Sequence, residues 1–371
     1  MAKKRYNGQP DPCGNAQIFI MKKRILVAPL NWGIGHATRC IPIINALIDA
    51  GFEPIIASDG QALDLLKKEF ENVTCLTLPA YNVTYAKSKT WFKWLMLWQL
   101  PKIKKAIKKE YCATQKIIED YNIKGIISDN RMGVLSKSVP SVFITHQLNV
   151  LSGSTTKLST YFHDHYLKAF DECWIPDFEN QPNLSGNLGH NFKNKGLTIK
   201  YIGPLSRLEK VKVKPKYDIM VLLSGPEPQR TILEEKLLSD LINYNGKVMF
   251  VRGKIEAEQT VMFETPFTIY NFMQTEELQQ TLNKSELVIS RSGYTTVMDL
   301  AKLGKQAFFI PTPGQFEQEY LAEYLNNQGV IASCSQEDFT LKQLERVTTY
   351  SGFKGLTNTI DFKALFLLFQ A

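Results

Sequence analysis

The stretch LVISRSGYTTVMD, residues 287–299, joins a short apolar strand, a Ser-Gly turn and the start of a helix. The first N–H groups of a helix have no partner within it, and the positive end of the helix dipole lies there. The turn at Ser292-Gly293 therefore predicts a site for a phosphate or diphosphate. Asp299 follows less than two helical turns later, within reach of a sugar hydroxyl attached to that phosphate. Together these features indicate a nucleotide site. The alternative is a purely structural connection with a solvated Asp299.

The length and composition of the chain restrict the classes of protein to consider. With 371 residues the chain is too long for one ordinary core, so we expect two domains. The net charge of +8 favours anionic partners, which include nucleotides, nucleic acids and acidic membrane surfaces. The six cysteines show no C-x-x-C spacing, which favours a reduced, cytoplasmic compartment and argues against a zinc site. No apolar run reaches 18 residues, so no transmembrane helix is expected. Residues 1–20 lack a signal-peptide core and are expected to be a disordered extension.

Strand and helix patterns alternate through both halves of the chain. Residues 24–30 predict a strand, a glycine-containing loop and an apolar-faced helix follow, and residues 53–57 predict the next strand. This order is a βαβ unit and implies a parallel sheet. The pattern restarts at residue 218 after a charged, proline-containing stretch. The expected fold class is α/β, with two Rossmann-like doubly wound domains that face each other across a cleft.

The predicted boundaries follow from these patterns. We expect a first domain at residues 21–203, a linker at 204–216 and a second domain at 217–350. Residues 351–371 are expected to form a C-terminal helix that packs back on the first domain. In open α/β sheets, ligands bind outside the carboxyl ends of the strands. The loops considered below all follow predicted strands, so they are expected at that edge.

Two parts of the sequence resemble the MurG-type (family 28) UDP-sugar transferases. In the second half the resemblance lies in Ser290-Arg291-Ser292-Gly293, Thr296-Val297, Asp299, Gly304, Pro311 and Gln318-Glu319-Tyr320. In the first half, Gly33-Ile34-Gly35-His36 is similar to the amino-terminal glycine-rich loop of the same enzymes. The resemblance covers roughly residues 24–335. It implies the GT-B fold and inverting, metal-independent transfer of a hexose or N-acetylhexosamine from a UDP-sugar to a hydroxyl acceptor. The UDP-sugar is then a co-substrate, and no separate cofactor is implied.

The resemblance also implies a set of donor-binding residues. Asp299 stands where the family has a ribose-binding glutamate, and Gln318 and Glu319 stand where two glutamines hold the sugar hydroxyls. Met273 lies in the turn whose backbone reads the uracil. The full predicted donor set is Gly33, Gly35, Ser224, Gly225, Arg230, Met273, Arg291, Ser292, Gly293, Thr296, Asp299, Gln318 and Glu319.

The loop SGPEPQR, residues 224–230, departs from the Gly-Gly-Ser-Gln-Gly loop of the family. Its two prolines remove backbone donors, and Glu227 would repel a diphosphate unless it turns away. Arg230 and Arg291 are the candidate cations for the leaving diphosphate. Asp299 is one methylene shorter than the family residue, and Glu319 lacks the amide donors of glutamine. The chain is therefore expected to be a relative of MurG rather than MurG itself, and the sugar stays open.

Sugar transfer to a hydroxyl needs a base on the acceptor side, and His36 follows the first strand where such a base would lie. Related transferases pair such a histidine with an aspartate after a later strand, and Asp129 occupies that setting. We expect Asp129 to orient His36 and stabilise its imidazolium. The alternative is that Asp129 caps a helix or pairs with Arg131. His146, which follows another strand, either lines the acceptor pocket or has a structural role.

Residues 87–109 combine aromatic residues with eight lysines and no acidic residue. Trp91, Trp94 and Trp98 share one helical face, as in an amphipathic helix that lies in an anionic membrane interface. We expect a lipid-linked or cell-envelope acceptor in a bacterial pathway and a peripheral position on the inner face of the cell membrane. The alternative is a core-facing helix with a solvated basic tail.

Three other functions remain open. A dinucleotide-binding oxidoreductase would use Gly33 and Gly35, although the third glycine of that fingerprint is missing. A non-hydrolysing UDP-sugar epimerase shares the two-domain architecture. A nucleic-acid-binding protein would fit the charge, but no nucleic-acid-binding motif accompanies the basic residues, so no nucleic acid partner is expected.

Overall fold

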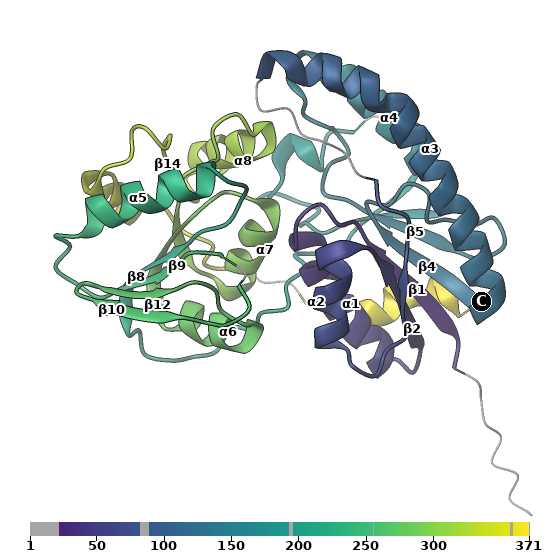
Figure 1. The fold of residues 1–371 in the computed structure, drawn as a ribbon, viewed down its shortest axis with the longest axis horizontal. Helices are drawn as coiled ribbons and strands as arrows, with labels where there is room; N and C mark the ends of the chain where they lie inside the picture. The colour runs from purple at the N-terminus through teal and green to yellow at the C-terminus, as the bar shows by residue number, and fades with distance from the viewer. Residues whose placement is uncertain (1–21, 82–88, 193–195, 255, 357–358, 371) are drawn as a thin grey trace, which may run out of the picture.

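The computed structural model describes residues 22–81, 89–192, 196–254, 256–356 and 359–370, with the side chains of residues 89–100 and 154 excepted. Two seven-stranded sheets form the core, each in its own half of the chain (Figure 1). The prediction of an α/β fold with two doubly wound halves is confirmed. The expectation for residues 1–20 lies outside the described residues.

The first sheet has the order β3-β2-β1-β4-β5-β6-β7, which is the strand order of the Rossmann fold with one added strand. Its strands are β1 (Arg24–Pro29), β2 (Glu53–Ser58), β3 (Cys75–Thr77), β4 (Ile123–Asp129), β5 (Ser141–Ile144), β6 (Glu172–Ile175) and β7 (Thr198–Tyr201). The helices of this half are α1 (Gly35–Asp49), α2 (Gly60–Glu69), α3 (Lys89–Tyr121) and α4 (Thr156–Leu167). Central strand β1 is buried on both faces, which explains its unbroken apolar sequence.

The second sheet has the order β10-β11-β9-β8-β12-β13-β14 and repeats the same arrangement. Its strands are β8 (Tyr217–Leu222), β9 (Val248–Val251), β10 (Val261–Glu264), β11 (Phe267–Tyr270), β12 (Ser285–Ser290), β13 (Gln306–Phe309) and β14 (Ala332–Ser333). The helices of this half are α5 (Gln229–Leu241), α6 (Thr275–Asn283), α7 (Tyr294–Leu303) and α8 (Phe316–Asn327). Only β10 is antiparallel to its neighbour among the pairs described. Helix α7 ends at Gly304, whose φ of 65° is the left-handed conformation that glycine adopts without a steric penalty.

Two segments connect the halves. Residues 204–216 contain no helix or strand, yet Leu205 and Leu208 are fully buried in the main core cluster. This stretch was predicted to be a linker, and its first part contributes to the core as well as connecting the halves. The linker prediction was based on the alternating lysines at residues 210–216, and the two buried leucines lie just before them.

The end of the chain packs on the first half, where Figure 1 shows it in yellow between α1 and the sheet. It forms a short helix, α9 (Phe362–Phe366), and one 3₁₀ turn rather than a long helix. The Phe366 ring meets Phe52 edge-on at 5.9 Å, and Phe369 lies 6.4 Å from Trp174. Gly125 in β4 leaves room for Phe369, because a Cβ there would lie 2.3 Å from the ring. The last residues therefore complete the core of the first half.

The described helices include none that is both apolar enough and long enough to span a bilayer.

Candidate active site

The strand order places the predicted catalytic residues at one point of the first sheet. Strands β1 and β4 are neighbours, and Pro29 pairs with Asp129 where both strands end. Connections leave β1 and β4 in opposite directions here, which is the switch point where open α/β sheets bind ligands. His36, on the first turn of α1, therefore meets Asp129. The His36 Nδ1 atom lies 2.8 Å from Asp129 Oδ1.

His36 is positioned to act as a neutral base. If Nδ1–H is donated to Asp129, the other nitrogen, Nε2, carries the free lone pair. Burial lowers the pKa of His36 and nearby Arg39 lowers it further, while Asp129 opposes both. The imidazole is therefore neutral at physiological pH, which is the state that accepts a proton.

Arg39 is a site residue that the sequence reading missed. It lies one helical turn after His36, is 2% exposed, and contacts both carboxylate oxygens of Asp129 through Nε and Nη2. Its Nη2 also lies 2.9 Å from His36 Nδ1, a contact that is not a hydrogen bond when Nδ1 is protonated and donates to Asp129. Burial raises the pKa of Asp129, but Arg39 and His36 outweigh burial and hold that pKa well below its usual range. The i, i+3 spacing from His36 was the available signal, since such residues share a helical face.

His146 joins the two halves instead of lining an open acceptor pocket. Its Nδ1 lies 3.2 Å from Arg39 Nη1, and its ring stacks on Tyr294 of the second half at 4.2 Å and 4°. Its Nε2 lies 3.3 Å from Glu317 Oε1, and Gln147 contacts Glu317 as well. Burial raises the pKa of Glu317, but His146, His36 and Arg39 together outweigh burial and lower that pKa. Glu317 was missed although it adjoins two predicted residues, because its role depends on how the halves dock.

The first turns of α1 and α7 approach each other at this interface. A Cβ on Gly35 would lie 2.5 Å from Thr295 Oγ1, so Gly35 allows a contact that a larger residue would prevent. Gly33 has a φ of 83°, which favours glycine in the loop before α1. Gly293 is the N-cap residue of α7 in an extended conformation and provides no side-chain cap. The free N–H end of α7 therefore faces the base-bearing edge of the first sheet.

The remaining predicted donor residues surround the end of β12. The Ser292 hydroxyl donates to the Gln318 carbonyl at 2.7 Å and so ties the turn to α8. Gln318 Oε1 accepts from the Thr312 N–H at 2.9 Å, and Glu319 Oε1 accepts from the Gly314 N–H at 2.7 Å. Thr296, on the first turn of α7, is half-buried.

Asp299 is held by a residue of the segment between the halves. The Ser206 hydroxyl donates to Asp299 Oδ1 at 2.6 Å. Burial raises the pKa of Asp299 to about 6, against the opposing effects of Ser206 and Arg207. Ser206 was not predicted, because the segment 204–216 was read as a linker.

Comparison with known proteins identifies the second half. Residues 229–359 match the glycosyltransferase family 28 C-terminal domain. A relative from Haemophilus ducreyi, UDP-N-acetylglucosamine–N-acetylmuramyl-(pentapeptide) pyrophosphoryl-undecaprenol N-acetylglucosamine transferase, is 23% identical over 219 residues. The match covers 57% of this chain and 58% of that protein, so the chain spans less than two thirds of the relative.

Solved structures agree on the architecture of both halves. A crystal structure of Acinetobacter baumannii MurG has a TM-score of 0.58 at 14% identity, and the match covers 94% of this chain and 99% of that chain. The spinosyn rhamnosyltransferase SpnG complexed with thymidine diphosphate has a TM-score of 0.58 at 14% identity, over 94% of this chain and 95% of that chain. The expected GT-B fold is confirmed, as is the resemblance to MurG-type proteins.

Arg291 is buried within the second half and bonded to protein oxygens, so the prediction that it faces the diphosphate is wrong. The guanidinium is 1% exposed and donates to four oxygens of the protein: the carbonyls of Ile310, Pro311 and Gln229, and Gln336 Oε1, at 2.7–3.1 Å. Side chains alternate along an extended chain, so Arg291 points opposite to its neighbours Ser290 and Ser292.

Arg230 also pairs with side chains of the second half. It is 3% exposed, donates to Glu234 at 2.6 Å and contacts Glu227. Two carboxylates therefore balance its charge, which leaves little for a diphosphate. Glu227 turns toward Arg230, the orientation that removes its repulsion from the predicted phosphate site. Of the other loop residues, Ser224 is exposed and Gly225 has a φ of 106°. Met273 packs half-buried against the main core cluster.

Arg131 does not pair with Asp129, so the pairing proposed as an alternative for that aspartate is wrong. The Arg131 guanidinium donates to Glu110 at 2.6 Å and to Asp59 at 2.7 Å. The partners of Asp129 are His36, Arg39 and, at 3.7 Å, the Cys40 thiol, and the contact with His36 favours the predicted dyad.

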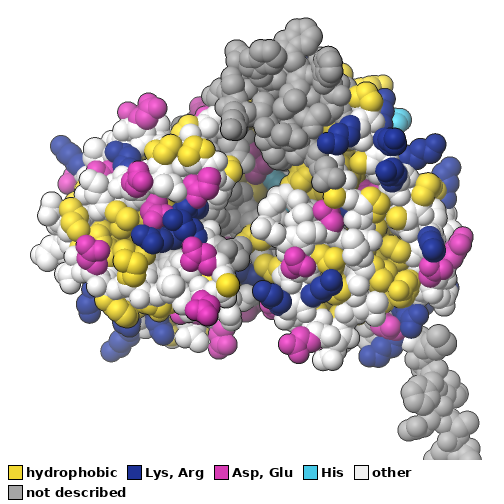
Figure 2. All heavy atoms as spheres, in the orientation of Figure 1, with side chains coloured by type: hydrophobic (Ala, Val, Ile, Leu, Met, Phe, Trp, Pro, Cys, Tyr) yellow, Lys and Arg dark blue, Asp and Glu magenta, His cyan; other side chains and the backbone are white. Residues whose placement is uncertain are grey.

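The side chains of Trp91, Trp94 and Trp98 lie outside the described residues, although the backbone of α3 passes through these positions. The rest of α3 has a buried apolar face and an exposed basic face, with Ile103 and Ile107 inside. The exposed lysines of this part are Lys102, Lys104, Lys105, Lys108, Lys109 and Lys116. Figure 2 shows basic side chains gathered over the α3 side of the molecule.

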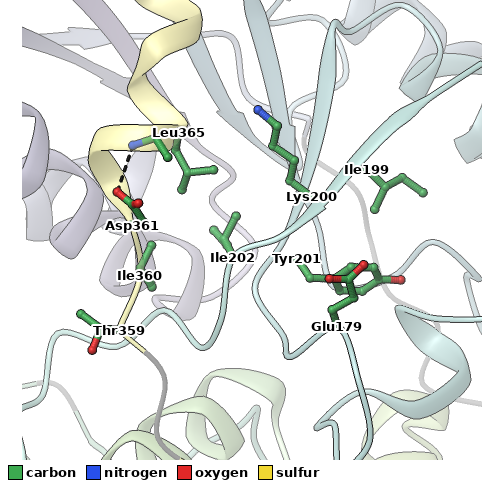
Figure 3. Close-up of a pocket in the computed structure, with 10 residues that line it drawn as sticks. Glu179, Ile199, Lys200, Tyr201, Ile202, Thr359, Ile360, Asp361 and Leu365 are labelled. Carbon is green, nitrogen blue, oxygen red and sulfur yellow. Dashed lines mark hydrogen bonds between the residues drawn. The ribbon is translucent and has the colours of Figure 1, made fainter.

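A cavity of about 400 Å³ lies elsewhere, between β7 and the C-terminal segment (Figure 3). Lys200, Tyr201 and Asp361 are among its lining residues, and none of the predicted site residues is. The cavity is open to solvent, and its lining residues lie far along the chain from the loops that carry His36 and Gly293. We therefore do not consider it the active site. No cluster of three or more metal-ligating side chains occurs within the described ranges.

Proposed function

We propose that this protein is an inverting glycosyltransferase that moves a hexose or N-acetylhexosamine from a UDP-sugar to a hydroxyl acceptor. The observation that carries the proposal is the His36–Asp129 pair, which faces the N-terminal end of α7 in the family 28 domain. The named activity of the Haemophilus ducreyi relative supports a UDP-sugar donor and a lipid-linked acceptor.

The proposed chemistry assigns each group one task. His36 Nε2 takes the proton of the acceptor hydroxyl as its oxygen attacks the anomeric carbon. The bond between that carbon and the diphosphate breaks on the opposite face, so the configuration inverts. Asp129 stabilises the imidazolium, and the N–H end of α7 stabilises the charge on the departing diphosphate. No metal or separate cofactor is needed for this sequence of steps.

A donor screen tests the proposal directly. UDP release is measured with UDP-GlcNAc, UDP-Glc, UDP-Gal and UDP-GlcA, with and without lipid extract as an acceptor source. We expect acceptor-dependent UDP release with one of these donors. Conversion of one UDP-sugar into another without acceptor would support the epimerase instead. Thermal stabilisation by NAD or by oligonucleotides, but not by UDP, would contradict the transferase.

The raised pKa of Asp299 gives the proposed ribose contact a pH dependence. The carboxylate protonates below about pH 6, so a ribose held by it should be bound about tenfold more weakly at pH 5 than at pH 7. Calorimetry with an intact UDP-sugar measures this, because an esterified diphosphate has no ionisation in that range. In Asp299→Asn the pH dependence should disappear. An unchanged pH dependence in this variant would rule out Asp299 as its source.

The raised pKa of Asp299 also predicts that Asp299→Asn stabilises the folded protein at neutral pH. The folded protein binds the proton more tightly than the unfolded chain, so wild-type stability falls as the pH rises from about 4 to 6. Asparagine removes this loss and should raise the free energy of unfolding at pH 7 by up to about 3 kcal/mol. Urea unfolding at pH 5 and pH 7 measures the difference.

We also propose that the protein is cytoplasmic and binds an anionic membrane through the basic face of α3. Each lysine near such a surface contributes about 1 kcal/mol at most, and salt screens that attraction. Sedimentation with phosphatidylserine vesicles should show binding at low salt that weakens when Lys102, Lys105 and Lys109 become Gln. Trp91→Ala, Trp94→Ala and Trp98→Ala test the aromatic contribution. Binding unaffected by both sets of changes would contradict this surface.

A further inference from the structure

Thr312 carries a buried hydroxyl that the described part of the protein leaves without a partner. The residue is 5% exposed and follows β13, and no described residue makes a hydrogen bond to its Oγ1. Native proteins pair nearly all buried polar atoms, so an unpaired one calls for an explanation such as a bound ligand. The backbone of Thr312 is fully used, since its N–H donates to Gln318 Oε1 at 2.9 Å.

The position of this hydroxyl is the second observation. Strands β8 and β13 flank β12, so the loops that follow β8 and β13 meet above the Ser292-Gly293 turn. Thr312 Oγ1 lies 3.9 Å from where a Cβ on Gly225 would be, and Gln318 Nε2 lies 3.9 Å from where a Cβ on Gly293 would be. No atom is closer to either position among the residues outside the immediate chain neighbours that the structure describes. The two glycines therefore leave a small space that Thr312 and Gln318 border, beside the N-terminal end of α7.

The loop after β8 supplies few donors to this space. Pro226 and Pro228 have no N–H, and Glu227 is turned to Arg230 and Thr231. An anion beside α7 therefore needs a donor from another element. A threonine hydroxyl can donate one hydrogen bond, and Thr312 has one uncommitted.

We propose that the Thr312 hydroxyl donates a hydrogen bond to the diphosphate of the nucleotide sugar. This inference rests on the proposed function, since it takes the same donor in the same place. It adds a binding residue on the loop after β13, outside the predicted donor set.

Three variants of the full-length protein test the inference by calorimetric titration with UDP. Thr312→Val removes the hydroxyl at nearly constant shape and should weaken UDP binding roughly 10- to 100-fold, as expected for a hydrogen bond to a charged group. Thr312→Ser keeps the hydroxyl and should stay within threefold of wild type. Thr114→Val is the matched control, because Thr114 is buried in α3 and its hydroxyl donates to the Glu110 carbonyl at 2.9 Å.

Thermal unfolding without ligand separates binding from folding. Thr312→Val should unfold at the same temperature as wild type or higher, since it removes an unpaired buried hydroxyl. Thr114→Val should unfold at a lower temperature with unchanged UDP affinity, because it removes a paired one. Weaker UDP binding together with a lower unfolding temperature in Thr312→Val would overturn the inference.

The remaining outcomes distinguish the inference from the proposed function. UDP affinity unchanged in Thr312→Val, with wild type binding UDP, would overturn the inference alone. An effect on UDP-sugar but not on UDP would place the contact on the sugar and overturn the assignment to the diphosphate. Wild-type protein that binds neither UDP nor a UDP-sugar would overturn the proposed function and this inference with it.

Discussion

His36→Ala is expected to lower the rate of sugar transfer 10²- to 10⁴-fold and to leave UDP affinity close to that of wild type. The reason is that His36 touches the acceptor side only, and a positioned general base contributes an effect of this size. Initial rates of UDP release with saturating donor measure the change. His165→Ala on α4 is the matched control, since that histidine is exposed and should keep the wild-type rate. Turnover within tenfold of wild type in His36→Ala would exclude the proposed base.

The pH dependence of the transfer rate distinguishes a catalytic base from a residue with a purely structural role. Burial and Arg39 lower the pKa of His36 below the ordinary value of about 6.5 for histidine, so the base stays unprotonated from neutral pH upward. The rate should therefore be flat above pH 7 and fall only on the acid side of 6.5. Asp129→Asn should lower the rate at every pH, because the imidazolium loses its stabilising charge. A rate that rises toward acidic pH would contradict His36 as the base.

Arg39→Met is expected to have the largest effect on stability. It would leave the Asp129 carboxylate buried without its bidentate partner, and removing one member of a buried pair typically costs about 3–5 kcal/mol. For a half of this size, that loss corresponds to a fall of roughly 10 °C in the unfolding temperature. Thermal unfolding and urea titration at pH 7 measure it.

Arg24→Met is the control for this experiment. Arg24 pairs with Glu53 at 3.1 Å, but both side chains are about one third exposed or more, so its loss should cost less than about 1 kcal/mol. The gap between wild type and Arg39→Met should narrow as the pH falls, because the unpaired Asp129 can then protonate. Equal losses in the free energy of unfolding of Arg39→Met and Arg24→Met would show that burial does not determine how much the Arg39–Asp129 pair stabilises the protein.

The α/β architecture and the catalytic pair were predictable because they rest on local patterns and one topological rule. Apolar runs mark the central strands, and the carboxyl ends of parallel strands share an edge, so His36 and Asp129 could be expected together. The predicted Ser292-Gly293 turn and the position of Gln318 rest on the same argument.

The remaining site residues depend on contacts between elements that sequence patterns do not encode. Glu317 of the second half contacts His146 and Gln147 of the first half, and Ser206, between the halves, contacts Asp299. These contacts form only when the two halves are docked. Arg291 follows β12 as expected, but its side chain points into the protein rather than toward the predicted phosphate site. The direction of a side chain at the end of a strand depends on where the alternation of side chains between the two faces ends. The sequence around Thr312 contains no motif that predicts a binding residue. Its unpaired hydroxyl is evident only from the three-dimensional structure.

The packing of Phe366 and Phe369 against the first sheet affects the order in which the chain folds during synthesis. The last strand of that sheet ends at Tyr201, and the rings that fill its core arrive roughly 170 residues later. At translation rates of about 5–20 residues per second, this delay amounts to roughly 10–30 s. The first half must therefore keep apolar surface exposed during synthesis until Phe366 and Phe369 have left the ribosome.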